Sequence, residues 1–242
     1  MRAEFVPLGG DLRGYYAVPD GPGPFPGVLL YQEAFGVTDY IASEVRRLAE
    51  HGYAGIAPDL FRGETFNYDE FPKLLPKLQA FTREGLLADA DAALAYLDAQ
   101  PNVRHDRYGA VGFCMGGRVA VMNAIFRPQK IAVASSFYGG GIAPVEAPRW
   151  GGTLYDDLPK LQGEVLLIYG ADDQGITPEE HARIAETLSK HKKRYTLSVY
   201  PGAPHGFASR DRESYRPQQA EDAWAQTLAL FDRALTGVPV SP

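Results

Sequence analysis

The chain has 242 residues, of which 45% are hydrophobic and 22% are charged, a balance typical of a globular protein. Its formal net charge of −6 argues against a surface that binds nucleic acid, and no segment approaches the roughly 20 apolar residues of a membrane span. The length predicts a single domain over residues 1–242, large enough to bury its own core without disulfides.

The predicted elements alternate between strands and helices along most of the chain. A short hairpin at residues 4–6 and 12–18 comes first. The apolar runs expected to form the next strands cover residues 27–31, 53–57, 106–112, 131–137, 164–169 and 195–200. The segments with helical spacing of apolar residues are 39–51, 84–99, 115–126, 178–191 and 216–235. Residues 64–78, rich in aromatic side chains and prolines, are expected to form an excursion over the edge of the sheet.

This alternation predicts an α/β fold with a mostly parallel central sheet and helices on both of its faces. Ligands of such sheets bind beyond the carboxyl ends of the strands. The side chains that follow predicted strands and can do chemistry are Glu33, Cys114, Asp172, Asp173 and His205. The remaining histidines, which we expect at the surface, are His51, His105, His181 and His191.

The only cysteine, Cys114, lies between glycines in residues 112–117, Gly-Phe-Cys-Met-Gly-Gly, directly after an apolar strand. That pattern is typical of a nucleophile elbow, in which a sharp strand-to-helix turn lifts the nucleophile clear of the sheet. A lone cysteine can also be a small core residue, so the motif needs support from the rest of the chain. One cysteine cannot form an internal disulfide, which fits a cytoplasmic location, and the scattered histidines predict no metal site.

Cysteine, aspartate and histidine follow the chain order of an α/β-hydrolase triad. The acid of such a triad usually lies three residues after the glycine that closes its strand. That offset from Gly170 favours Asp173 over its neighbour Asp172, which we then interpret as a turn or surface residue. The pattern therefore predicts a thiolate nucleophile, Cys114, served by the base His205.

These motifs resemble the dienelactone hydrolase family over roughly residues 10–235. The segment 32–37, Gln-Glu-Ala-Phe-Gly-Val, is similar to the family's Gln-Glu-x-Phe-Gly-Val. Residues 52–54 and 58–60, the elbow, the Gly-x-x-Asp turn and the segment Gly-x-x-His-Gly-Phe also match. The resemblance implies an α/β-hydrolase that cleaves small esters or lactones without a cofactor.

The resemblance also implies a role for each matched residue. Glu33 would be a buried carboxylate that keeps the resting sulfur as a neutral thiol until substrate binds, because a nearby carboxylate disfavours ionisation of a thiol. The implied catalytic residues are Cys114, His205, Asp173 and Glu33, and the implied oxyanion donors are the backbone N–H groups of Ala34 and Met115.

The substrate clamp departs from the family pattern. Two arginines would hold the carboxylate of dienelactone, but residues 69–78 contain Lys73 and Lys77 and no arginine, and Arg210 lies one position beyond the expected place. Arg210 and Phe35 are the candidate substrate-binding residues, and the pocket is expected between Phe35, Phe61, Phe81 and Phe207. We therefore expect a small ester or lactone rather than dienelactone itself.

Two other functions remain open at this point. The first is a thiol redox sensor or ligand-binding protein on the same fold, against which the complete Asp–His pair argues. The second is a non-catalytic relative. No nucleic-acid or membrane partner is expected, and the sequence does not define an oligomeric state.

Overall fold

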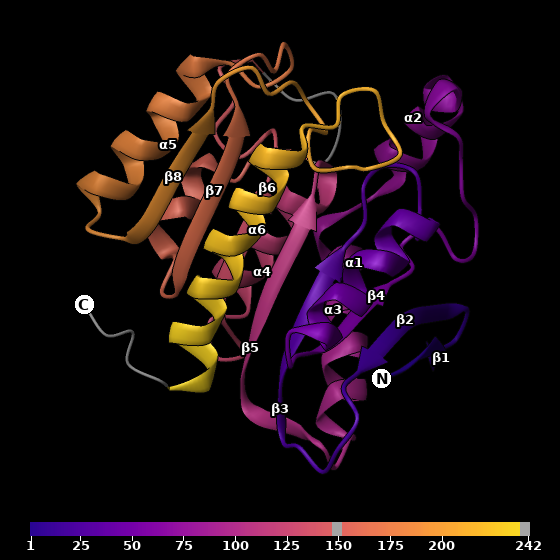
Figure 1. Cartoon of the computed structure of the whole chain (residues 1–242). Coiled ribbons are helices and arrows are strands. Elements are labelled where there is room, and N and C mark those ends of the chain that lie inside the picture. Colours follow the sequence, from indigo (N-terminus) through magenta and orange to yellow (C-terminus); the bar gives the residue numbers. More distant parts are fainter. Residues whose placement is uncertain (147–151, 238–242) are drawn as a thin grey trace.

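The computed structural model describes residues 1–146 and 152–237 and contains one eight-stranded sheet (Figure 1). The strands are β1 (Arg2–Gly9), β2 (Leu12–Val18), β3 (Phe25–Tyr31), β4 (Ala54–Pro58), β5 (Val103–Phe113), β6 (Ile131–Phe137), β7 (Glu164–Gly170) and β8 (Arg194–Tyr200). The α-helices are α1 (Asp39–Glu50), α2 (Phe71–Ala80), α3 (Arg83–Asp98), α4 (Met115–Phe126), α5 (Pro178–Lys190) and α6 (Pro217–Phe231). Short helical turns are η1 (Tyr68–Glu70), η2 (Tyr155–Lys160) and η3 (Asp232–Thr236).

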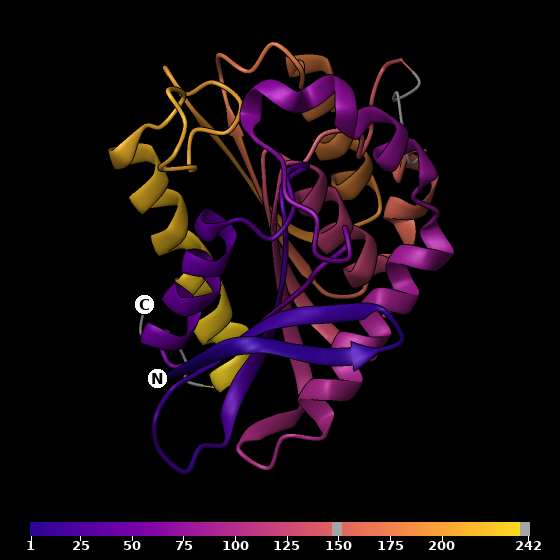
Figure 2. The same cartoon turned by 90° about the vertical axis from the view of Figure 1, so that its right-hand side faces the viewer.

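The sheet order is β1-β2-β4-β3-β5-β6-β7-β8. The pairs β1–β2 and β2–β4 are antiparallel, and every pair from β4 to β8 is parallel. Helices α1 and α6 cover one face, and α3, α4 and α5 cover the other (Figure 2). The prediction of a mostly parallel sheet between two helical layers is confirmed.

Helix α4 shows why the sequence folds in this way around the elbow. Eleven of its residues, from Met115 to Ile125, are buried, because the helix packs on β5 and β6 on one side and meets α3 on the other. A helix with apolar residues on nearly every side is accommodated in such an interior position. The elbow is therefore held by a rigid, fully packed element.

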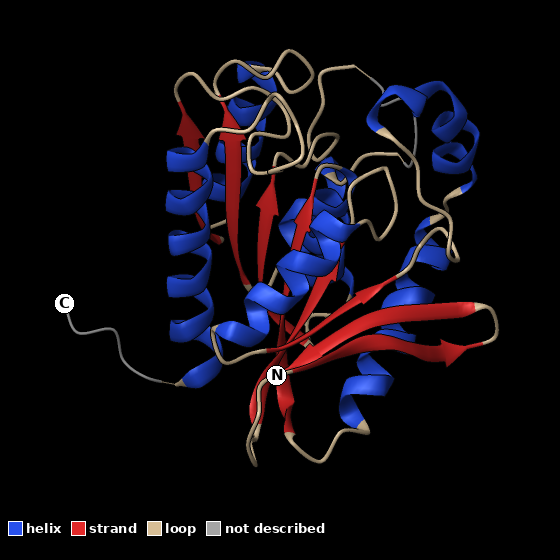
Figure 3. Cartoon of the chain, turned by 45° about the vertical axis from the view of Figure 1, so that its right-hand side comes forward, coloured by secondary structure: helices blue, strands red, loops and turns tan. Residues whose placement is uncertain are grey.

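Residues 64–78 form more regular structure than the sequence indicates. Within the expected excursion, η1 and α2 occupy most of the segment and stand beyond the carboxyl ends of the strands (Figure 3). Pro72 lies in the first turn of α2, where no hydrogen bond from its nitrogen is needed, and Pro76 lies inside the helix. Because of these two prolines the segment was not predicted to be a helix, although Leu74 and Leu78 are spaced by four residues and are the buried residues of α2.

The register of the sheet brings the carboxyl ends of its strands together. Tyr31 of β3 pairs with Gly112 of β5, and Phe113 pairs with Phe137 of β6. At the far side, the last residue of β7, Gly170, pairs with Tyr200 of β8. The segments that follow these strands therefore start at one edge of the sheet, where the sequence predicts the site. Among the described residues, no helix is long and apolar enough to cross a membrane.

Candidate active site

Cys114 stands on a strained turn between β5 and α4. Its backbone has φ 54° and ψ −118°, a conformation that is rare for a residue with a side chain. The flanking glycines are required sterically, since a Cβ at Gly112 would lie 2.1 Å from the carbonyl oxygen of Gly116. Likewise a Cβ at Gly116 would lie 2.3 Å from the carbonyl oxygen of Tyr31. This is the geometry of a nucleophile elbow.

Asp173 and His205 form a hydrogen-bonded pair beside the elbow. Nδ1 of His205 lies 2.7 Å from Oδ2 of Asp173, whose side chain is completely buried. The other carboxylate oxygen of Asp173 accepts a hydrogen bond from the backbone N–H of Gly175 at 2.8 Å, which fixes the carboxylate in its turn. Asp172 is exposed, and its backbone forms the hydrogen bonds: its N–H donates to the carbonyl oxygen of Ala203, and its own carbonyl oxygen accepts from the side-chain amide of Gln174.

The surroundings of His205 favour its protonated form when Cys114 is ionised. Burial alone would lower the pKa of His205, but the charge of a Cys114 thiolate, hydrogen bonds to Asp173 and to the sulfur, and the charge of Asp173 raise it to about 10. About a third of the His205 side chain is exposed, so solvent can reach the ring. The arrangement can therefore stabilise a thiolate–imidazolium pair and admit a water molecule beside it.

Glu33, the residue after Gln32 at the end of β3, is buried next to this pair. Burial raises its pKa, and this effect is opposed by the charges of Arg212 and His205 and by a hydrogen bond from Tyr138. The hydroxyl of Tyr138 donates to Oε1 of Glu33 at 3.4 Å, and Nη1 of Arg212 lies 3.7 Å from the same oxygen. The carboxylate thus has partners that oppose the effect of burial on its pKa.

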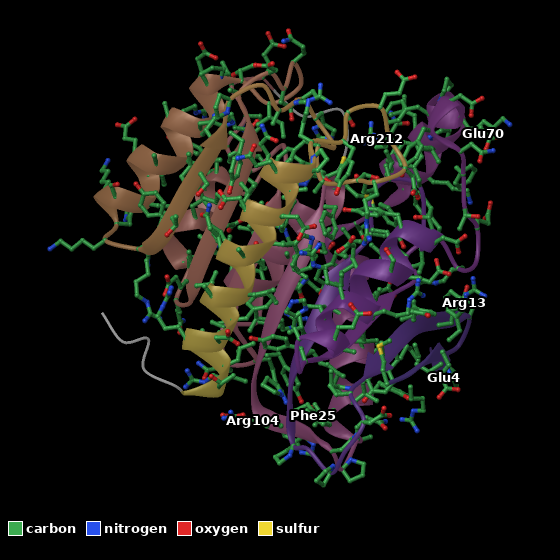
Figure 4. All side chains as sticks on the ribbon, in the orientation of Figure 1. Glu4, Arg13, Phe25, Glu70, Arg104 and Arg212 are labelled. Carbon is green, nitrogen blue, oxygen red and sulfur yellow. The ribbon has the colours of Figure 1, made fainter. Side chains whose placement is uncertain are left out.

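Arg212 is a site residue that our sequence analysis missed. It lies in the loop between β8 and α6, at the end of the molecule where α2 stands, whereas Arg104 and Phe25 mark the opposite end (Figure 4). Its guanidinium lies over the ring of Tyr68, 5.0 Å from the ring centroid. The sequence indicated only that a buried Glu33 would require a nearby cation. It did not indicate which basic residue supplies that cation.

The predicted substrate-binding residues lie elsewhere than expected. Arg210 donates to Oε1 of Glu44 at 2.7 Å and to Ser43 at 3.3 Å, so its charge is committed to α1. Phe35 is buried against Tyr68, with ring centroids 4.6 Å apart. Neither side chain lines the cavity that contains Cys114.

That cavity has a volume of about 1060 Å³ and lies between α2, the segment after β6 and the segment between β7 and α5. The residues that line it include Cys114, Asp173 and His205, together with both proposed oxyanion donors, Ala34 and Met115. Its apolar wall comes from Phe71, Leu75 and Leu78 of α2. The pocket therefore has side chains of α2 in its wall and none of the four expected phenylalanines, of which Phe61 and Phe81 stack on each other with centroids 5.7 Å apart.

One histidine expected at the surface is partly buried. His181, near the start of α5, stacks on Tyr169 with ring centroids 4.2 Å apart, and burial lowers its pKa. Its Nε2 is buried and has no hydrogen-bond partner among the described residues. The sequence did not reveal this packing, because His181 follows the acidic pair at the polar start of its helix.

The chain is similar to known proteins over nearly its whole length. The model of the dienelactone hydrolase family matches residues 12–235. A protein of Synechocystis sp. named "Putative carboxymethylenebutenolidase" is 34% identical over 235 residues, which cover 93% of each chain. A protein of the same name from Escherichia coli K12 is 33% identical and covers 93% of this chain and 84% of its own.

Solved structures show the same relationship. The crystal structure of a "Putative Dienelactone Hydrolase" from Klebsiella pneumoniae superposes with a TM-score of 0.88 at 30% identity, covering 96% of this chain and 98% of its own. A dienelactone hydrolase-like promiscuous phosphotriesterase from metagenomic libraries superposes with a TM-score of 0.80 at 25% identity, covering 97% and 98%. The chain is therefore a carboxylic ester hydrolase of the α/β-hydrolase type. It belongs to the dienelactone hydrolase family.

Proposed function

We propose that the protein hydrolyses small esters or lactones through a Cys114–His205–Asp173 triad and a thioester intermediate. The observation that carries this proposal is the hydrogen-bonded Asp173–His205 pair beside a cysteine on a strained elbow. A thiol sensor or a ligand-binding module on this fold needs neither the histidine nor its buried acid. The complete pair therefore favours catalysis over the alternative function.

In the first half of the reaction, the Cys114 thiolate attacks the carbonyl carbon and a carbon–sulfur bond forms. The negative charge that develops on the carbonyl oxygen faces the backbone N–H groups of Ala34 and Met115. The tetrahedral intermediate then collapses, the bond to the alcohol oxygen breaks, and protonated His205 gives its proton to that oxygen. In a lactone the released alcohol stays attached to the acyl group.

In the second half, His205 takes a proton from water, and the resulting hydroxide attacks the thioester carbon. The carbon–sulfur bond breaks, the carboxylic acid leaves, and the thiolate returns. Asp173 keeps the imidazole in one orientation through both halves. Glu33 lies near the resting sulfur and opposes its ionisation, which protects the thiol from oxidation between turnovers.

Two further expectations belong to this proposal. Residues 1–242 act as one domain, and the protein works in the cytoplasm, where a reducing environment keeps a nucleophilic thiol reduced. Cell fractionation followed by immunoblotting checks the location, and recovery of the protein in an oxidising compartment would contradict it.

Hydrolysis of p-nitrophenyl acetate by the wild type and by Cys114→Ala tests the main proposal. We expect the variant to lose activity by several orders of magnitude, and we expect intact-mass analysis of the wild type with a slow ester to show an acyl adduct on Cys114. Cys114→Ser is expected to be slow, since a hydroxyl needs stronger base assistance than a thiol. Full activity in Cys114→Ala would overturn the proposal.

A further inference from the structure

Arg118 is a buried cation that the triad does not account for. It follows Cys114, the N-cap residue of α4, by four residues and lies near the start of that helix. Both residues line the active-site cavity, and the Arg118 side chain lies within its wall with a relative exposure of only 5%. A positive charge is therefore built into the same cavity wall as the nucleophile.

The segment after β6 fixes the position of this guanidinium. Nη1 of Arg118 donates to the carbonyl oxygen of Gly152 at 2.9 Å. A Cβ at Gly141, which has a φ of +76°, would lie only 2.5 Å from that nitrogen, so the backbone passes directly over the guanidinium. The nearest acidic residue from α5, Glu180, uses Oε1 to accept the backbone N–H groups of Ile142 and Ala143 at 2.8 and 3.1 Å.

The guanidinium of Arg118 stays protonated although it is buried. Burial lowers the pKa of its guanidinium to about 10, while the charges of Cys114 and then of Glu180 act in the opposite direction. A pKa of about 10 leaves the group protonated at neutral pH. Because the interaction between two charges is mutual, a cation that a thiolate stabilises also stabilises that thiolate.

We infer that Arg118 is a positioning residue that acts through Cys114, by supplying a fixed positive charge that stabilises the thiolate in the cavity. The charge favours the attacking thiolate before acylation and the departing thiolate at deacylation. The effect of the Arg118 charge on turnover rests on the function proposed above. Its effect on the ionisation of the Cys114 thiol does not depend on that function.

This charge acts among other titratable groups of the site. They are Glu33 after β3, Tyr138 after β6, Asp173 after β7, His205 and Arg212 in the loop between β8 and α6, and Glu180 of α5. Glu33 opposes ionisation of the thiol, and Arg118 favours it. Substitution of Arg118 alone changes one of these charges and leaves the others in place.

The inference is tested by alkylation of the free thiol as a function of pH, which is unambiguous because Cys114 is the only cysteine. The variants are Arg118→Met, which removes the charge, Arg118→Gln, which keeps a donor for Gly152, and Arg118→Lys, which keeps the charge. The matched control is Arg183→Met, because Arg183 of α5 donates to the carbonyl of Pro144 in the same segment but does not line the cavity.

We expect Arg118→Met and Arg118→Gln to move the midpoint of iodoacetamide alkylation to higher pH by about one pH unit. At a pH where the thiol is fully ionised, the rate with anionic iodoacetate relative to neutral iodoacetamide should fall several-fold. Arg118→Lys and Arg183→Met should stay near the wild type. Unchanged profiles in both uncharged variants, or the same shift in Arg183→Met, would overturn the inference in favour of a purely structural residue.

Ester hydrolysis then separates this inference from the proposed function. Loss of the Arg118 charge should reduce kcat/KM for a neutral ester as well as for an ester with a carboxylate, because the thiolate reacts with both. A loss confined to the anionic ester would make Arg118 a substrate-binding residue and overturn the inference. If the wild type hydrolyses no ester but the Arg118 variants show the expected shifts in alkylation, the proposed function alone is refuted.

Discussion

Nη1 of Arg212 lies 3.7 Å from Oε1 of Glu33, whose carboxylate is almost completely buried. Arg212 lies in the loop after β8, 12 residues beyond the end of that strand. The pair places a cation beside a carboxylate whose pKa burial would otherwise raise further. We therefore treat Arg212 as the residue that allows Glu33 to carry charge next to the nucleophile.

We predict that Arg212→Met destabilises the protein by roughly 1–3 kcal/mol near pH 8 and by less near pH 5. The pKa of Glu33 is raised in the folded protein, so its ionisation costs stability as the pH rises through that value, and loss of Arg212 enlarges this cost. Urea unfolding at the two pH values measures the difference. The double variant with Glu33→Gln should regain most of the stability at pH 8, and an equal loss at both pH values would contradict the assignment.

The two adjacent aspartates should behave differently. Asp173→Asn removes the buried acid that accepts from His205, and loss of the acid in a comparable triad lowers kcat by about 10⁴. Asp172→Asn changes an exposed side chain and should be mild. Steady-state kinetics of both variants with p-nitrophenyl acetate provides the comparison, and the reverse ranking would refute the assignment of the acid.

Glu33→Gln should make the thiol easier to ionise. The amide removes the negative charge that opposes a thiolate but keeps the size of the side chain, so the midpoint of iodoacetamide alkylation should move to lower pH. Cys114 is the only thiol, so the alkylation rate reports on this site alone. An unchanged profile would leave Glu33 with a structural role only.

Small neutral or singly anionic esters should be preferred to dienelactone. Arg210 is bound to Glu44, and the side chains of α2 that line the cavity are apolar. Apolar contacts discriminate weakly, by about 1–3 kcal/mol for a methylene-sized difference, so a broad substrate range is expected. The test is a comparison of kcat/KM for a neutral short-chain ester and for dienelactone. A preference for dienelactone above about a hundredfold would show that another basic residue holds its carboxylate.

The sequence predicted the parts of the fold that local patterns determine. Apolar runs located the parallel strands, and helical spacing located α4 at residues 115–126, as found in the structure. The elbow could be recognised because the backbone around Cys114 excludes side chains at Gly112 and Gly116. These features follow from short-range sterics and periodicity, which a single sequence displays.

Other features depend on how loops fold back over the sheet. The prolines of α2 concealed the helix that forms the apolar wall of the cavity. Arg210 and Arg212 differ by two positions, yet one pairs with Glu44 and the other with Glu33, because the conformation of their loop decides which side chain turns inward. No periodicity marks such a choice.

That loop carries two of the active site's charged groups on one short piece of chain. Between His205 and Arg212, the backbone N–H of Ser209 donates to the carbonyl of Gly206, and the N–H of Arg212 donates to the carbonyl of Ser209. The hydroxyls of Tyr68 and Tyr40 bind the same segment, at Ser209 and at the carbonyl of Ala208. The placement of this one segment therefore sets both the position of the imidazole beside the elbow and the position of the guanidinium beside Glu33.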